Sequence, residues 1–300
     1  MTGVHGPVII EAALNGGRGR AEHPGVPYTA AQLAAEARRC VEAGATVVHV
    51  HARDDDGGWT ADPARYAQVV RAVRKAVPDV LISITSIRPA GVPVDTLLDL
   101  LEILTGDPFT RPDLISVNLG HIVAWEPAPE RRSRQTVHFP NAYEEIASLL
   151  AACARHDIRP ELGLMDLGFI SNAVALLQDG RLPPDPWFLI ELDSPAYGAG
   201  AQVAPATVAN YEALTAALRE QIPAARWAAH GQGIAGYAVI GRALADGAHA
   251  RVGFEDAIHL PDGRLAASNA DQVTWAISAA RRVGREPASY ADARAILGCA

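Results

Sequence analysis

The sequence has 300 residues, of which 49% are hydrophobic and 20% are charged, and this balance is typical of a soluble globular protein. Its net charge of −8 gives no electrostatic basis for binding nucleic acid. The amino terminus lacks a signal-peptide pattern, and no segment has the apolar length of a membrane span. The cysteines Cys40, Cys153 and Cys299 lack the spacing of a zinc motif, so we expect a reducing, cytoplasmic location.

Strand-like and helix-like segments alternate along the whole chain. The strand candidates, in chain order, are 8–14, 46–51, 80–85, 114–118, 159–164, 187–192, 226–230 and 250–254. The helix candidates are 30–43, 63–77, 94–104, 142–155, 170–177, 205–220, 234–246 and 270–282. Short apolar strands without alternation indicate a parallel sheet covered by helices. Eight such units without a linker predict one α/β domain over residues 1–300, a closed (β/α)8 TIM barrel rather than an open sheet.

The connection 120–141 is longer than an average loop. It contains Trp125, several prolines and the basic residues Arg131, Arg132 and Arg134. A long segment in a compact barrel is usually functional or contacts another subunit. Two interpretations of the basic residues are open, since they either bind a ligand or form a solvated surface.

Two histidines, His49 and His51, end the second strand candidate after the apolar run 45–48. Because side chains alternate along a strand, both imidazoles face the same side. Two imidazoles on a rigid strand suit a divalent metal, and the alternative is two polar residues satisfied at a strand end. Active sites of such barrels lie at the carboxyl ends of the strands, so the pair favours an enzyme.

Three charged residues, Arg251, Glu255 and Asp256, follow or end the eighth strand candidate. The second and eighth strands of a closed barrel both flank the first, so their ends converge over the barrel mouth. Glu255 would then complete a two-histidine, one-glutamate site with a fourth position for water or substrate, as in catalytic zinc centres. Asp256 is a candidate base, and Arg251 a candidate partner for a carboxylate. The alternative is a surface cluster of ion pairs.

Further polar residues end the third and fourth strand candidates. Thr85 and Ser86, followed by Arg88, supply hydroxyls and a guanidinium that suit a substrate carboxylate. Alternatively, the two hydroxyls cap the next helix. Ser116 and Asn118 lie on one face of the fourth strand and are candidates for the same role.

Five segments make the chain similar to the β-keto acid cleavage enzyme family. They are HVHARDDDGGWTADPARY (49–66), TS (85–86), SVNLG (116–120), PELGLMDLG (160–168) and RVGFEDAIHLPDGRLAASNADQV (251–273). They occur in family order over nearly the whole chain, and the first and last together are specific. The resemblance implies a (β/α)8 barrel, usually a homotetramer, with zinc as cofactor and acetyl-CoA as co-substrate.

The resemblance also implies roles for individual residues, with zinc at His49, His51 and Glu255. The other residues that it implies are the general base Asp256, its supporting Arg251, a hydroxyl from Thr85 or Ser86, and Glu161 as a substrate- or site-facing carboxylate. The implied reaction converts a β-keto acid and acetyl-CoA to acetoacetate and a new acyl-CoA by a Claisen and retro-Claisen route. A zinc Lewis acid would stabilise the enolate, so a carboxylate suffices as the base.

The chain departs from the family pattern after the first strand, where Asn15-Gly16-Gly17-Arg18 replaces the frequent T-G-A. Arg18 occupies the position nearest to a substrate-selecting residue. We hypothesise that Arg18 disfavours an aminated substrate and favours a neutral or acidic side chain. His230, at the end of the seventh strand, is either a further polar group of the site or a packed histidine. No glycine-rich phosphate loop marks a CoA site, so CoA is expected at the strand-end loops.

Two other functions use the same residues. A zinc-dependent aldolase or hydrolase on this barrel needs similar ligands, and turnover without a thioester would favour it. A catalytically inactive ligand-binding barrel is the third reading, and the intact set His49, His51, Glu255 and Asp256 counts against it. In all three readings the partner is a small molecule, and the homo-oligomer is what the family resemblance implies.

Overall fold

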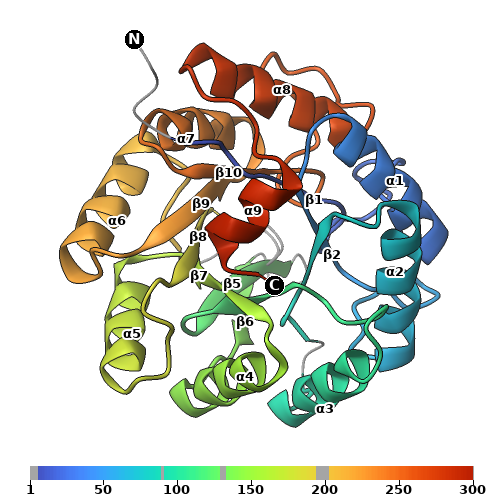
Figure 1. Cartoon of the computed structure of the whole chain (residues 1–300), viewed down its shortest axis with the longest axis vertical. Helices are drawn as coiled ribbons and strands as arrows, with labels where there is room; N and C mark the ends of the chain where they lie inside the picture. Colours follow the sequence, from blue (N-terminus) through green and yellow to red (C-terminus); the bar gives the residue numbers. More distant parts are fainter. Residues whose placement is uncertain (1–5, 89–90, 129–132, 194–202, 300) are drawn as a thin grey trace.

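The computed structural model describes residues 6–88, 91–128, 133–193 and 203–299. Its barrel strands are β1 (Ile10–Ala13), β2 (Val47–Val50), β3 (Leu81–Ile84), β4 (Leu114–Asn118), β7 (Arg159–Leu164), β8 (Trp187–Leu192), β9 (Arg226–Gly231) and β10 (His249–Val252). These parallel strands form a closed barrel in the order β1-β10-β9-β8-β7-β4-β3-β2, and helices surround it (Figure 1). The predicted (β/α)8 TIM barrel is therefore confirmed.

A helix follows each barrel strand as the sequence predicts, and a further helix near the carboxyl terminus was not predicted. The helices are α1 (Ala30–Glu42), α2 (Pro63–Ala76), α3 (Val94–Thr105), α4 (Tyr143–His156), α5 (Leu167–Gln178), α6 (Val208–Gln221), α7 (Gly233–Ala245), α8 (Asn269–Arg282) and α9 (Tyr290–Leu297). Among the described residues, no helix combines the length and the apolar character that crossing a membrane requires.

Capping side chains explain where several helices begin. The Thr29 hydroxyl accepts a hydrogen bond from the Gln32 amide and starts α1, and Asp62 starts α2 with Pro63 as the first helical residue. Helix α5 begins earlier than the predicted Ile170, because the Asp166 carboxylate accepts from the Phe169 amide. Helix α6 begins later than predicted, because Thr207 is its cap.

The segment 120–141 is not a plain loop. It forms an antiparallel hairpin of β5 (Ile122–Ala128) and β6 (Ser133–Phe139), with Ile122 opposite Phe139. The expectation that this segment is a loop was wrong. Its two halves pair with each other through their backbones and form a separate two-stranded sheet, although the segment contains prolines. Arg131 and Arg132 lie outside the described residues. Helix α9 was also missed, since its single apolar face is short.

Alternate residues of the barrel strands face the interior and form layers. At the amino-terminal end the inner residues are apolar and pack with α9, in a cluster of Ile9, Val47, Leu81, Leu114, Trp187, Leu189, Ala228, Ala293 and Leu297. Helix α9 thus closes this end of the barrel, and Figure 1 draws it across the centre of the ring. The next layer toward the carboxyl ends is polar although it is buried, and it holds Glu11, His49, Ser83, Glu161 and Arg251. This layer supports the candidate site.

Candidate active site

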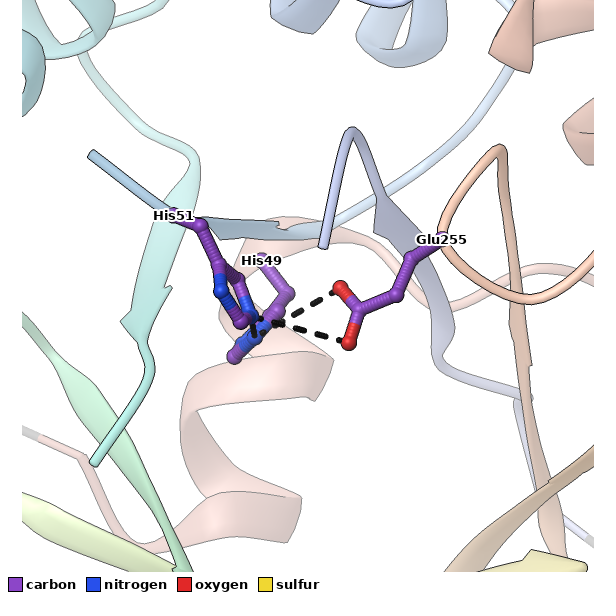
Figure 2. Close-up of side chains that lie close together, drawn as sticks. All are labelled: His49, His51 and Glu255. Carbon is purple, nitrogen blue, oxygen red and sulfur yellow. Dashed lines mark hydrogen bonds and ion pairs between the residues drawn. The ribbon is translucent and has the colours of Figure 1, made fainter. Parts of the chain in front are cut away.

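Three predicted ligands, His49, His51 and Glu255, meet at the barrel mouth. His49 belongs to β2, His51 follows it directly, and Glu255 lies in the turn after β10. Nε2 of His51 is 3.1 Å from Nε2 of His49, and these nitrogens are 3.6 and 3.7 Å from the Glu255 carboxylate oxygens. Figure 2 shows both imidazoles turned toward the carboxylate.

The three side chains match the donor set of a divalent metal. Ligand atoms at zinc bond lengths of ~2.0–2.1 Å in a tetrahedral array lie about 3.3–3.5 Å apart, close to the 3.1, 3.6 and 3.7 Å separations. Oε2 of Glu255 is buried without a hydrogen-bond partner among the described residues. An orphaned carboxylate oxygen beside two imidazoles is an arrangement that a cation would stabilise.

The protonation states also suit a cation. Burial holds the pKa of His49 well below its usual value, so the imidazole is neutral and free to bind a metal. Burial raises the pKa of Glu255, but the positive charge of Arg251, together with the two imidazoles, outweighs it and holds this pKa well below its usual value. The site therefore presents a carboxylate and a neutral imidazole ligand.

Ser83 and Asn15, which were not among the predicted site residues, hold the two histidines in place. Oγ of Ser83 is 2.9 Å from Nδ1 of His49 and fixes the ring opposite its Nε2. The Asn15 side chain accepts from the His51 amide at 3.0 Å and donates to the His51 carbonyl at 2.9 Å. In the sequence, Ser83 stands out as a polar residue within an apolar strand, and Asn15 as a polar residue directly after the first strand candidate.

A glycine without a side chain makes room for Glu255. Gly16 has a φ of +49°, and a Cβ atom there would lie 2.1 Å from Cγ of Glu255. We expect Gly16→Ala to displace Glu255 and to weaken divalent-metal affinity by roughly 10–100-fold, measured by competition with a chromophoric chelator. Gly180→Ala is the matched control, because Gly180 has a φ of +65° but no atom within 4 Å of the added Cβ. Equal metal affinity in the two variants would contradict this role of Gly16.

Arg251 holds the predicted base Asp256. Its Nε and Nη2 atoms donate to the two Asp256 oxygens at 3.1 Å each, and Nη2 is also 2.6 Å from Oε1 of Glu255. Burial lowers the pKa of Arg251, but the charges of Asp256 and Glu255 outweigh it and raise this pKa well above its usual value. The side chains are only 3%, 4% and 11% exposed for Arg251, Asp256 and Glu255, so they are not a surface ion-pair cluster.

Glu161 lies in the buried polar layer of the barrel, where it contacts other side chains of the protein. Its Oε1 accepts from the Trp187 indole at 3.2 Å, and its Oε2 is 3.5 Å from the Ser83 hydroxyl, which contacts His49. Burial, and then the negative charge of Glu161, raise the pKa of neighbouring Glu11 well above its usual value. Burial raises the pKa of Glu161 as well, and a proton held between Glu11 and Glu161 lets the two carboxyl groups share this layer.

The other predicted substrate residues line the ends of β3 and β4. Oγ1 of Thr85 accepts from the Ile87 amide at 2.9 Å, whereas α3 starts only at Val94 after Pro93. The hydroxyls therefore do not cap that helix. Ser116 is half-buried and stands opposite Glu161 in the β4–β7 register.

A pocket of about 360 Å³ opens at these strand ends. Its wall combines polar groups with apolar side chains, from Ser86, Ile87, Arg88, Val92, Pro93, Asn118, Ile122, His138, Phe139, Pro140, Asn141 and Glu145. The Arg88 guanidinium donates to the Glu145 carboxylate at 3.0 Å and to the Val92 carbonyl at 2.7 Å. The predicted residues Ser86 and Asn118 therefore border this pocket.

Arg18 contacts the segment that carries Glu255. Its guanidinium donates to the carbonyls of Phe254 and Glu255 at 3.0 and 3.2 Å, and it pairs with Glu22 at 2.5 Å. The side chain is 13% exposed. Arg18 thus places a positive charge next to the candidate metal site while it holds the turn after β10.

Nearly the whole sequence matches one known enzyme family. The sequence model of the beta-keto acid cleavage enzyme family matches residues 7–299. The chain belongs to this family. The resemblance seen in the sequence is therefore confirmed, as is the prediction that the chain is an enzyme.

Two curated members of the family are similar over nearly their whole length. The chain is 29% identical to a 3-keto-5-aminohexanoate cleavage enzyme of Fusobacterium nucleatum, over 97% of both proteins. It is 30% identical to a 3-oxoadipate:acetyl-CoA acetyltransferase of Cupriavidus necator, over 97% of this chain and 95% of the relative. Among solved structures, a ternary complex of ObcA with a C4-CoA adduct and oxalate has a TM-score of 0.69 at 18% identity, over 92% of this chain and 68% of that chain. At this identity the likeness concerns the fold alone.

Proposed function

We propose that this member of the family is a zinc-dependent acyltransferase that converts a β-keto acid and acetyl-CoA to acetoacetate and an acyl-CoA. The observation that carries the proposal is that the three candidate metal ligands lie beside the candidate base. His49, His51 and Glu255 converge within 3.7 Å of one another, and Arg251 bridges Glu255 to the buried carboxylate of Asp256. The names of the relatives, which include an acetyl-CoA acetyltransferase, support the same reaction.

The metal at His49, His51 and Glu255 would act as a Lewis acid toward negative charge that develops on the substrate's carbonyl oxygens. Asp256 takes a proton from C2 of the β-keto acid, between its two carbonyl groups, and stays fixed by Arg251. The carbanion forms a C–C bond to the acetyl carbonyl carbon, and the CoA thiolate leaves that carbon. The thiolate then attacks the original keto carbon, the old C–C bond breaks, and Asp256 returns its proton to acetoacetate.

Acetoacetate release tests the proposed function. A panel of β-keto acids is incubated with the metal-loaded protein with and without acetyl-CoA, and acetoacetate and acyl-CoA are quantified by mass spectrometry. We expect at least one acid to give both products in equal amounts, and only when acetyl-CoA is present. Turnover that needs no thioester would support the aldolase or hydrolase alternative. The homotetramer and the cytoplasmic location stay predictions.

The same panel tests the substrate preference attributed to Arg18. Its guanidinium lies on the backbone carbonyls of Phe254 and Glu255 and adds positive charge beside the site. We expect kcat/KM for neutral or acidic β-keto acids to exceed that for 3-keto-5-aminohexanoate by about tenfold or more, since removing one repulsive contact is worth roughly 1.4 kcal/mol. A preference for the aminated acid would contradict this prediction.

A further inference from the structure

His230 is a buried imidazole that the proposed reaction leaves without a role. It is the last residue but one of β9, is 1% exposed, and stands opposite Glu191 in the β8–β9 register. Its inward direction follows from the alternation along β9, where Trp227 and Ala229 pack in the outer core. His230 therefore belongs to the polar end of the barrel, next to the strand that leads to Asp256.

Each ring nitrogen of His230 faces a carboxylate. Nδ1 is 3.3 Å from Oδ1 of Asp256, and Nε2 is 3.6 Å from Oε2 of Glu191. Neither nitrogen makes a well-directed hydrogen bond with a described residue. A buried polar group without a partner is costly, and loosely aligned contacts of active sites often tighten when the substrate binds. The ring thus lies where a small movement would give it a hydrogen bond to a carboxylate oxygen.

The two oxygens of Asp256 have different surroundings. Oδ1 lies near two donors, since it accepts from Nη2 of Arg251 at 3.1 Å and faces Nδ1 of His230 at 3.3 Å. Among the described residues, Oδ2 accepts a hydrogen bond only from Nε of Arg251, at 3.1 Å. An oxygen with fewer donors keeps a lone pair for an incoming proton. The asymmetry therefore favours Oδ2 as the oxygen that receives the substrate proton.

We propose that His230 is a positioning residue for Asp256, which holds Oδ1 through Nδ1 so that Oδ2 is directed toward C2 of the substrate. The inference rests on the proposed function, since it gives Asp256 the role of base. Glu191 lies on the opposite side of the ring, with its Oε2 3.6 Å from Nε2 of His230. Arg251 alone allows the carboxylate to tilt within its fork, and a third contact from another strand removes that freedom.

A matched pair of substitutions tests which ring nitrogen matters. The amide nitrogen of His230→Asn occupies the place of Nδ1 and keeps the contact with Asp256, whereas that of His230→Gln occupies the place of Nε2. The readout is exchange of the C2 proton of a β-keto acid in D2O without acetyl-CoA, together with kcat, KM, bound zinc and the melting temperature. We expect His230→Asn to stay within about threefold of the wild-type exchange rate and His230→Gln to be lower by roughly 10–100-fold, at equal zinc content and KM.

Exchange of the C2 proton and release of acetoacetate together distinguish a failure of this inference from a failure of the proposed function. Equal rates of exchange in the Asn and Gln variants, or a wild-type protein that catalyses no exchange, would overturn the role of His230. A wild-type protein that exchanges the C2 proton but releases no acetoacetate from acetyl-CoA would instead contradict the proposed reaction, and the Asn and Gln variants would still test the positioning of Asp256. A structural role alone would lower the melting temperature of both variants and leave their exchange rates alike.

Discussion

Asp256→Asn is expected to retain bound zinc and to lower turnover by about 10²–10⁴-fold, the contribution that is typical of a general base. The amide keeps one oxygen for the Arg251 fork but cannot take up the C2 proton. Glu255 still faces Arg251 at 2.6 Å, so the buried guanidinium keeps one carboxylate partner. The measurements are acetoacetate release under saturating substrates and zinc content by elemental analysis.

Asp246→Asn is the matched control for that substitution. Asp246 also pairs with an arginine, since its Oδ1 is 3.0 Å from Arg242, but it caps α7 at the outside of the barrel. Its variant is expected to turn over at the wild-type rate. Full activity in Asp256→Asn would overturn the assignment of the base, and a loss of zinc from this variant would move the defect to the metal site.

His49→Ala is expected to remove most of the bound zinc, from about one ion per chain in the wild type. The loss should be larger than for Glu255→Gln, because His49 is 1% exposed and its ring is aligned by Ser83. Since a metal that binds only the folded state stabilises it by mass action, added zinc should raise the melting temperature of the wild type but not of His49→Ala.

His156→Ala is the control for that experiment, because His156 ends α4 and contacts Glu102 at 2.5 Å, away from the barrel mouth. Zinc content and the zinc-dependent rise in melting temperature should be those of the wild type. If His49→Ala bound as much zinc as this control, the two-histidine, one-glutamate site would be refuted.

The barrel was predictable from the alternation of strand and helix patterns, and the meeting of the three ligands followed from the strand order of a closed barrel. Alternation places His49 and His51 on one face, and the strand order of a closed barrel brings Glu255 to them. The bounds of β4, β7 and β8 also agree with the prediction.

The supporting residues were not predictable, because their roles depend on register between strands. Ser83 meets His49 across 34 positions, and Asn15 meets His51 across 36. No spacing in the sequence indicates that Glu11 and Glu161 lie in one layer. The hairpin of β5 and β6 was hidden because its prolines weaken the strand pattern.

The pairing of β1 with β10, in which Ile10 stands opposite Ala250, joins the two ends of the chain. The ligand atoms at the end of β2 and in the turn after β10 are neighbours only when β1 and β10 are paired. A partly folded chain in which β10 has not paired with β1 therefore lacks one of the three candidate ligands, so we expect metal affinity to appear only in the closed barrel.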